Sequence, residues 1–163
     1  MAPKAGGGIT TVATGQKFPR GVALDGANVY WANWVSGGAV RAAPVGGGPT
    51  VDLATGLDGP HDLVVFGADL YVVEMLGGRI LRIPTTGGGA TELASGQTRP
   101  YDIAVDPSGI YWTDQGDGAV RMLTHGSTTV VTLASGTDTV REIAVTTDFV
   151  FWTTDNGLMR LAR

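Results

Sequence analysis

Apolar and polar residues alternate along this chain in short runs that are separated by turns rich in glycine. Four runs begin with a polar residue and continue with aliphatic ones: 20–24 (RGVAL), 61–65 (HDLVV), 101–105 (YDIAV) and 141–145 (REIAV). Each is followed by a run with aromatic residues: 28–33 (NVYWAN), 69–74 (DLYVVE), 109–114 (GIYWTD) and 149–154 (FVFWTT). Alternation with a period of two predicts β-strands, because successive side chains of a strand point to opposite faces of the sheet.

The same pattern recurs four times with one period. A turn of small residues ends at a glycine in each copy, and the four glycines are almost equally spaced along the chain: Gly15, Gly56, Gly96 and Gly136. A third run in each copy ends at an arginine, and the four arginines are Arg41, Arg82, Arg121 and Arg160. A fourth run follows in three copies, at residues 49–54, 90–94 and 128–134. Each copy therefore predicts four short strands joined by turns.

The predicted strands have apolar or small residues on both faces, so their sheets must be covered on both sides. A period of about 40 residues with four strands per copy is typical of the blades of a β-propeller. We predict an all-β fold, a β-propeller with four four-stranded antiparallel blades. The whole chain, residues 1–163, is one propeller unit, with approximate repeats 16–56, 57–96, 97–136, and 137–163 together with 1–15.

Two short motifs resemble known propeller repeats. Residues 111–114 (YWTD) are similar to the signature of YWTD-type propellers, and residues 99–106 (RPYDIAVD) resemble the blade opening of NHL-type and streptogramin-lyase-like propellers. The resemblance covers essentially the whole chain and implies a blade rather than an activity. The other copies read YWAN, YVVE and FWTT at the position of YWTD, so we interpret this run as mainly structural.

The fourth copy lacks an outer strand, whereas residues 3–15 (PKAGGGITTVATG) parallel residues 84–96 (PTTGGGATELASG). We therefore expect the N-terminal strand to complete the last blade, because an open blade would expose strand edges. The strand could close a four-bladed ring within one chain, or two chains could form an eight-bladed ring. Modest side chains in the outer strands favour the homodimer, and an excised half-propeller stays a further alternative. The near-integer repeat count is consistent with an engineered or recently amplified protein.

Composition and charge narrow the functions. Glycine contributes 26 of 163 residues, which disfavours long helices. The net charge is −4 without any cluster of basic residues, so we expect no nucleic-acid partner. No apolar run reaches the length of a membrane span, and residues 1–10 lack the apolar segment of a signal peptide. The sequence predicts a soluble protein of unknown location, and the absence of cysteine excludes disulfides and thiolate metal sites.

The resemblance to propellers places a binding site at the mouth of the central channel, near the start of each innermost strand. The variable polar residues there form the candidate binding site, for an unknown small ligand or protein. Trp34, which has no aromatic counterpart in the other copies, is a further candidate contact. The candidates are Arg20, His61, Tyr101, Arg141, Asp62, Asp102, Glu142 and Trp34. The plainer interpretation is a solvated mouth in which the arginines pair with the acids.

A catalytic interpretation rests on His61 and the acids. Streptogramin lyases use a histidine with a divalent metal, and only residues 60–62 (PHD) match that feature here. Asp62, Asp102 and Glu142 could bind calcium or magnesium if they converge. His61 and Asp62 are adjacent on a strand and point to opposite faces, which disfavours a direct pair. We therefore expect a non-catalytic binding or assembly scaffold without cofactor, with a metal-assisted lyase or lactonase as the alternative.

Overall fold

The computed structural model describes residues 8–136 and 138–163, which form strands and turns and contain no helix. The prediction of an all-β fold is confirmed. No helix that could cross a membrane occurs in these residues. The strands are β1 (Pro19–Leu24), β2 (Asn28–Asn33), β3 (Ser36–Pro44), β4 (Val51–Asp58), β5 (Pro60–Phe66), β6 (Asp69–Glu74), β7 (Arg79–Pro84), β8 (Thr91–Ala94), β9 (Pro100–Asp106), β10 (Gly109–Asp114), β11 (Ala119–Thr124), β12 (Val130–Ala134), β13 (Val140–Val145), β14 (Phe149–Thr154) and β15 (Leu158–Ala162).

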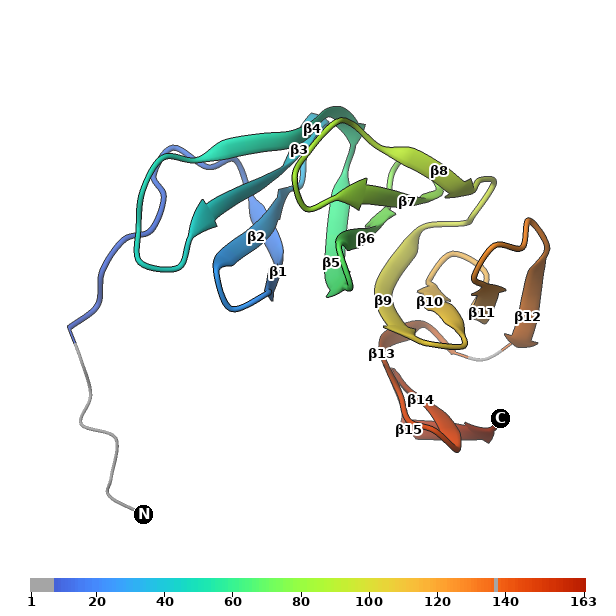
Figure 1. Ribbon diagram of the computed structural model, residues 1–163. Coiled ribbons are helices and arrows are strands. Elements are labelled where there is room, and N and C mark those ends of the chain that lie inside the picture. The colour runs from blue at the N-terminus through green and yellow to red at the C-terminus, as the bar shows by residue number, and fades with distance from the viewer. Residues whose placement is uncertain (1–7, 137) are drawn as a thin grey trace, which may run out of the picture.

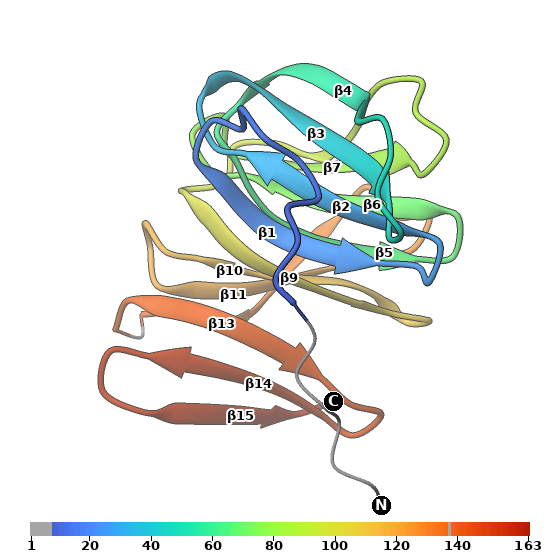
Figure 2. The ribbon, with the colours of Figure 1, turned by 90° about the vertical axis from the view of Figure 1, so that its left-hand side faces the viewer.

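The strands form four antiparallel sheets in chain order, which we call blades 1 to 4. Blades 1 to 3 have four strands each, β1–β4, β5–β8 and β9–β12, whereas blade 4 comprises β13–β15 in the part of the chain that the structure describes. The blades follow one another along an open arc, with β1, β5, β9 and β13 innermost (Figure 1). Turned by 90°, the same sheets are seen stacked face to face (Figure 2). This arrangement is that of propeller blades.

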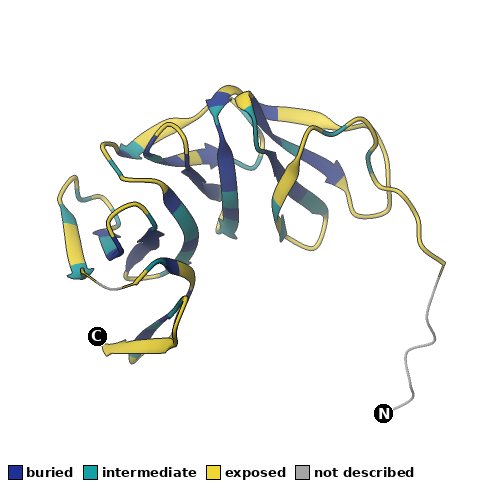
Figure 3. Ribbon diagram, turned by 180° about the vertical axis from the view of Figure 1, so that it is seen from behind, coloured by how far each residue is buried: buried dark blue, intermediate teal, exposed yellow. Residues whose placement is uncertain are grey.

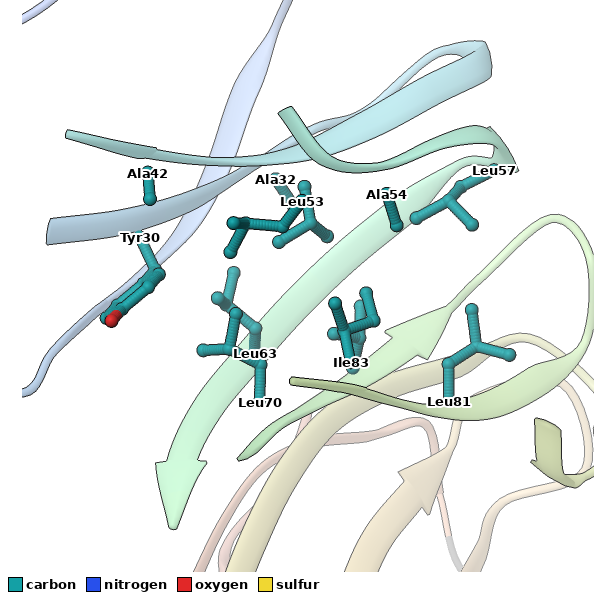
Figure 4. Close-up of a cluster of buried hydrophobic side chains, with 12 residues drawn as sticks. Tyr30, Ala32, Ala42, Leu53, Ala54, Leu57, Leu63, Leu70, Leu81 and Ile83 are labelled. Atoms are coloured by element: carbon teal, nitrogen blue, oxygen red, sulfur yellow. The ribbon is translucent and has the colours of Figure 1, made fainter. Parts of the chain in front are cut away.

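The core lies between the blades rather than within any one of them. Between blades 1 and 2, Tyr30 and Leu53 pack with Leu63, Leu70 and Ile83, and all five side chains are buried (Figure 4). Equivalent clusters join blade 2 to blade 3 and blade 3 to blade 4. Burial of an aliphatic or aromatic side chain stabilises the fold by about 1.5–3 kcal/mol. Each blade is therefore stabilised by its neighbours, and a face without a neighbour is left incomplete.

The aromatic residues of the YWTD run belong to this core. Tyr111 packs toward blade 4 and Trp112 toward blade 2, with 1% and 0% of their surfaces exposed. Adjacent residues of β10 thus face opposite neighbours, as the alternation of strand side chains requires. These two aromatic residues serve packing, in agreement with the structural interpretation of the motif.

The described residues form an open arc and do not close into a ring. Residues 8–18 contain no strand, and Ile9 is fully exposed, at 103% of its reference surface. The described start of the chain and β15 lie at opposite ends of the arc (Figure 1). All residues of β15 are exposed, as its yellow colour shows (Figure 3). The predicted closing strand is therefore not formed within the single chain, and the part of that prediction on residues 1–7 lies outside the described residues.

Candidate functional site

The start of each innermost strand carries a β-bulge at the same place. The register of β1, β5, β9 and β13 against the second strand of its blade shifts near Arg20, Asp62, Tyr101 and Arg141, respectively. A bulge bends a strand and redirects its side chains. Consecutive innermost strands contact one another along the arc (Figure 1). The bulges therefore bring polar residues of all four strands to one region.

This region contains a cavity of about 210 Å³. Six of the eight predicted site residues line it together with Gly21, and they come from all four blades: Arg20, His61, Asp62, Tyr101, Asp102 and Glu142. The structure thus brings together residues that are far apart in sequence, from Arg20 in the first copy to Glu142 in the fourth. Their role in binding stays a prediction.

Arg141 and Trp34 do not line the cavity. Arg141 forms an ion pair with Asp155, at 2.7 Å between Nη2 and Oδ1, and both side chains are about half exposed. Trp34 lies beside the cavity, where the guanidinium of Arg20 is 5.2 Å from its ring centroid. Its ring also meets the His61 ring edge-on, with 6.5 Å between centroids. Trp34 therefore contacts two of the cavity residues.

The acidic residues of the cavity interact with one another. The side chains of Asp62 and Asp102 interact with each other, and a hydrogen bond between them forms when one of the two carboxyls holds a proton. Burial, this hydrogen bond and the nearby charge of Asp62 raise the pKa of Asp102 to about 7. Glu142 is exposed, but its partial desolvation at the cavity and the neighbouring Asp102 also raise its pKa. In this cluster the pKa of each of the three carboxyls is raised above its ordinary value by burial.

Asp102 also joins two blades. Its Oδ2 accepts a hydrogen bond from the backbone N–H of Ile143 in blade 4, at 2.6 Å. Next to it, the Thr113 hydroxyl accepts from the backbone N–H of Asp102 and donates to the carbonyl of Arg141, at 3.2 and 2.5 Å. These polar side chains satisfy backbone groups that the bulges remove from the sheet ladder. Part of the predicted site is therefore structural.

His61 is buried, with 8% of its surface exposed. Its Nδ1 lies 2.9 Å from the carbonyl oxygen of Tyr101, and the two rings are 4.4 Å apart. Burial lowers the pKa of His61, so the neutral ring donates from Nδ1 to that carbonyl. No hydrogen bond between His61 and a carboxylate occurs among the described residues. The adjacent Asp62 therefore does not orient the ring, as the alternation along a strand predicts.

The alternative metal site is not organised in this structure. Among residues 8–136 and 138–163, no three His, Asp or Glu side chains are grouped so as to hold a metal ion. Asp62 and Asp102 bond to each other and to backbone N–H groups instead. Calcium or magnesium binding by Asp62, Asp102 and Glu142 stays a prediction.

Sequence reasoning missed two buried acids at the ends of the second strands. Glu74 and Asp114 end β6 and β10 and are fully buried. Glu74 pairs with Arg79, whereas Asp114 Oδ2 lies 2.5 Å from Arg121 Nη1 and also accepts from the N–H of Thr98. A usable signal was present, because each acid is followed by an arginine across the next hairpin. Both pairs stabilise turns and lie outside the cavity.

Comparison with known proteins supports the fold. No protein-family model matches the chain, and no curated protein matches its sequence. A crystal structure of the computationally designed Ika4 protein is similar, with 11% identity and a TM-score of 0.78, over 97% of this chain and 99% of that chain. Virginiamycin B lyase from Staphylococcus aureus follows, with 16% identity and a TM-score of 0.74 over 88% of this chain and 51% of the lyase.

A chain in the crystal structure of a nidogen/laminin complex is also similar, with 16% identity and a TM-score of 0.67, over 90% of this chain and 76% of that chain. At these identities the likeness shows the fold alone, which is that of a β-propeller. This chain spans about half of the length of the lyase.

Proposed function

We propose that the chain is a non-catalytic propeller scaffold, and that two copies assemble into an eight-bladed ring. The proposal rests on a difference in exposure between the two ends of the arc and the junctions between neighbouring blades. Residues that are buried at internal junctions have exposed counterparts on blades 1 and 4. A twofold dimer would cover both ends with the same two contacts, as isologous assemblies do.

The free face of blade 1 lacks the cover that the other blades have. Val22 in β1 has 66% of its surface exposed. The residues at the same register position in the other innermost strands are Leu63, Ile103 and Ile143, and they have 3%, 5% and 9% exposed. Each of those three packs against the preceding blade. The exposure of Val22 therefore supports the proposal that a blade of a second copy covers this face of blade 1.

The free face of blade 4 supports the same proposal for the other end of the arc. Leu158 in β15 has 71% of its surface exposed. Its counterparts in the third strands, Val40, Ile80 and Val120, are each 0% exposed and pack against the following blade. An apolar face of this kind is an aggregation liability when it is uncovered. We expect blade 1 of a second copy to fit this face, because it has the same strand order as the blades that cover Val40, Ile80 and Val120.

Residues 9–13, the N-terminal arm, would supply the missing outer strand. In blade 2, Ile80 pairs with Ala94 and Leu81 with Glu92, and blade 3 has the same register with the same irregularity. Because residues 3–15 align with residues 84–96, this register transfers to blade 4. The expected pairs are Ala13 with Leu158, Thr11 with Met159 and Thr10 with Arg160.

The arm of one chain and β15 of the same chain are at opposite ends of the arc, which favours exchange between two chains (Figure 1). The completed ring would surround a channel with two copies of the polar cavity. We propose that this channel mouth is the binding surface of the scaffold, for a small ligand or another protein.

A mass measurement in solution tests the assembly. One chain has a mass of 16.8 kDa, so the ring of two chains would have twice that mass. Light scattering coupled to size-exclusion chromatography, repeated over a hundredfold range of concentration, separates the two species. The mass of two chains is expected, and the mass of one chain at all concentrations would overturn the proposal.

A further inference from the structure

The junction between blades 3 and 4 contains a polar clamp made of two side chains of blade 3. Asp102 accepts from the N–H of Ile143, and Thr113 donates to the carbonyl of Arg141. The clamp therefore binds one donor and one acceptor of the bulged backbone of β13. Thr113 is fixed in place because it also accepts from the N–H of Asp102.

Blade 4 carries the same clamp, although no blade follows it within residues 8–136 and 138–163. Glu142 occupies the position of Asp102, and Thr153 occupies that of Thr113. The Thr153 hydroxyl accepts from the N–H of Glu142, at 3.1 Å, just as Thr113 accepts from Asp102. Within the described part of the chain, the Thr153 hydroxyl donates to no carbonyl oxygen. Glu142 is exposed, whereas Asp102 is half-buried.

The hydroxyl is not a feature of every blade. Ala32 and Val73 occupy the position of Thr113 in blades 1 and 2. At the junction of blades 2 and 3, the carbonyl of Tyr101 is bonded by His61 instead. A threonine at this position therefore accompanies a clamp of the type seen between blades 3 and 4, and Thr153 predicts one more such junction.

The innermost strand of blade 1 offers the matching backbone. β1 has its bulge between Arg20 and Val22, as β13 has one between Val140 and Ile143. By register, the N–H of Val22 corresponds to that of Ile143, and the carbonyl of Arg20 corresponds to that of Arg141. In addition, Gly21 has no side chain at the position of the acids, so nothing of its own obstructs access to this backbone.

We infer that Glu142 and Thr153 form an intersubunit clamp on the innermost strand of a second copy of this chain. The Glu142 carboxylate accepts from the N–H of Val22 of the partner subunit, and the Thr153 hydroxyl donates to the carbonyl of Arg20 of the partner subunit. The inference rests on the proposed ring and specifies how its junction is recognised. A twofold dimer contains two such clamps.

The test compares two double variants. Glu142→Met with Thr153→Val removes both groups of the clamp with little change in shape. Glu92→Met with Thr132→Val is the matched control, because these exposed residues lie on outer strands away from the junction. Loss of four hydrogen bonds per dimer is expected to raise the dissociation constant about 100-fold or more. The control is expected to leave it unchanged within about threefold.

Amide hydrogen exchange gives a second readout that does not depend on the stability of the variant. In the wild type, the Val22 amide is expected to be protected together with that of Ile143. In the clamp variant, protection of Val22 is lost while Ile143, which Asp102 of the same chain holds, keeps its protection. A wild-type dimer whose affinity and Val22 protection are unchanged in the variant would overturn the clamp and leave the ring intact. A wild-type monomer would overturn both.

Discussion

The carboxylate of Asp102 accepts a hydrogen bond from the backbone of Ile143, 41 residues further along the chain. One side chain thus belongs both to the polar cavity and to the junction between blades 3 and 4. Such a residue cannot be changed for binding studies without an effect on the fold. Because the pKa of Asp102 is raised, that effect can be measured through the pH dependence of stability.

Asp102→Asn is expected to flatten the dependence of stability on pH. The carboxyl has a pKa of 3.8 in the unfolded chain and about 7 in the fold. Between these values the folded state holds more protons than the unfolded state, so wild-type stability falls as pH rises from about 4 to about 7. The asparagine cannot titrate, yet its oxygen can still accept from Ile143. We expect the variant to be relatively more stable above pH 7, by on the order of 2 kcal/mol.

Urea denaturation at intervals from pH 4 to pH 8 measures this difference. Asp148→Asn is the control, because Asp148 lies exposed in a turn of blade 4. It is expected to follow the wild-type curve. Parallel curves for Asp102→Asn and the wild type would show that the Asp102 carboxyl is ionised throughout that range.

Arg121→Met is expected to destabilise the protein by about 3 kcal/mol, because it leaves Asp114 buried without its ion partner. Burial already raises the pKa of Asp114, so the variant gains a proton as pH falls and its deficit shrinks. Arg41→Met is a matched control at the same register position, since Arg41 pairs with the exposed Asp52. The control is expected to cost under about 1 kcal/mol by urea denaturation, and equal losses would contradict the argument.

The blades could be predicted from the sequence because their strand pattern recurs in each copy. The register of the paired strands within a blade could not be predicted. Aligning the four arginines suggests equivalent positions, yet Arg121 pairs opposite Trp112, whereas Arg160 pairs opposite Phe151. The hairpin between β14 and β15 is shorter than that between β10 and β11. The shift by one residue turns the side chain to the other face of the sheet. The shorter turn of blade 4 therefore accounts for this difference in register, which the alignment of the arginines does not show.

The site could be predicted in outline because its candidate residues lie at the start of the innermost strand in every copy. The cavity gathers six of the eight candidates, including Tyr101 and Glu142. The sequence could not indicate that the Asp62 and Asp102 carboxyls interact and that the pKa of Asp102 is raised, because both depend on the distance between two blades. It also could not indicate that Arg141 turns away to Asp155, an exposed residue of the next hairpin.

Calcium and magnesium are expected to leave thermal stability unchanged, because Asp62 and Asp102 already bond to each other and to the backbone. Calorimetric scans with either ion and with a chelator test this. A metal-dependent rise in melting temperature that Asp62→Asn abolishes would favour the metal-assisted enzyme instead. His61→Ala is a poor substitute for this test, because His61 is buried and its loss would destabilise the fold.

Leu158→Asp is expected to abolish the dimer while the single chain stays folded. A charge would be placed on an apolar face that the second copy must cover, at the cost of its desolvation. In the single chain Leu158 is 71% exposed, so the change costs the monomer little. Val131→Asp, on an outer strand where the valine is 48% exposed, is the control. Light scattering is expected to give the mass of one chain for the first variant and of two chains for the second, and a dimer in both would exclude this face from the interface.

Gly21→Ala is expected to destabilise the protein by about 2 kcal/mol or more, since it affects both the backbone and the cavity. Gly21 has a φ of +42°, which an alanine adopts only with strain. A Cβ atom would also lie 2.7 Å from Oδ1 and 2.9 Å from Cα of Asp62. Blade 1 thus needs a glycine where the other blades carry acids, because Asp62 already occupies that space. Gly46→Ala, whose added atom would meet nothing within 4 Å, should change the urea midpoint little, and an equal loss at both positions would disprove the steric account.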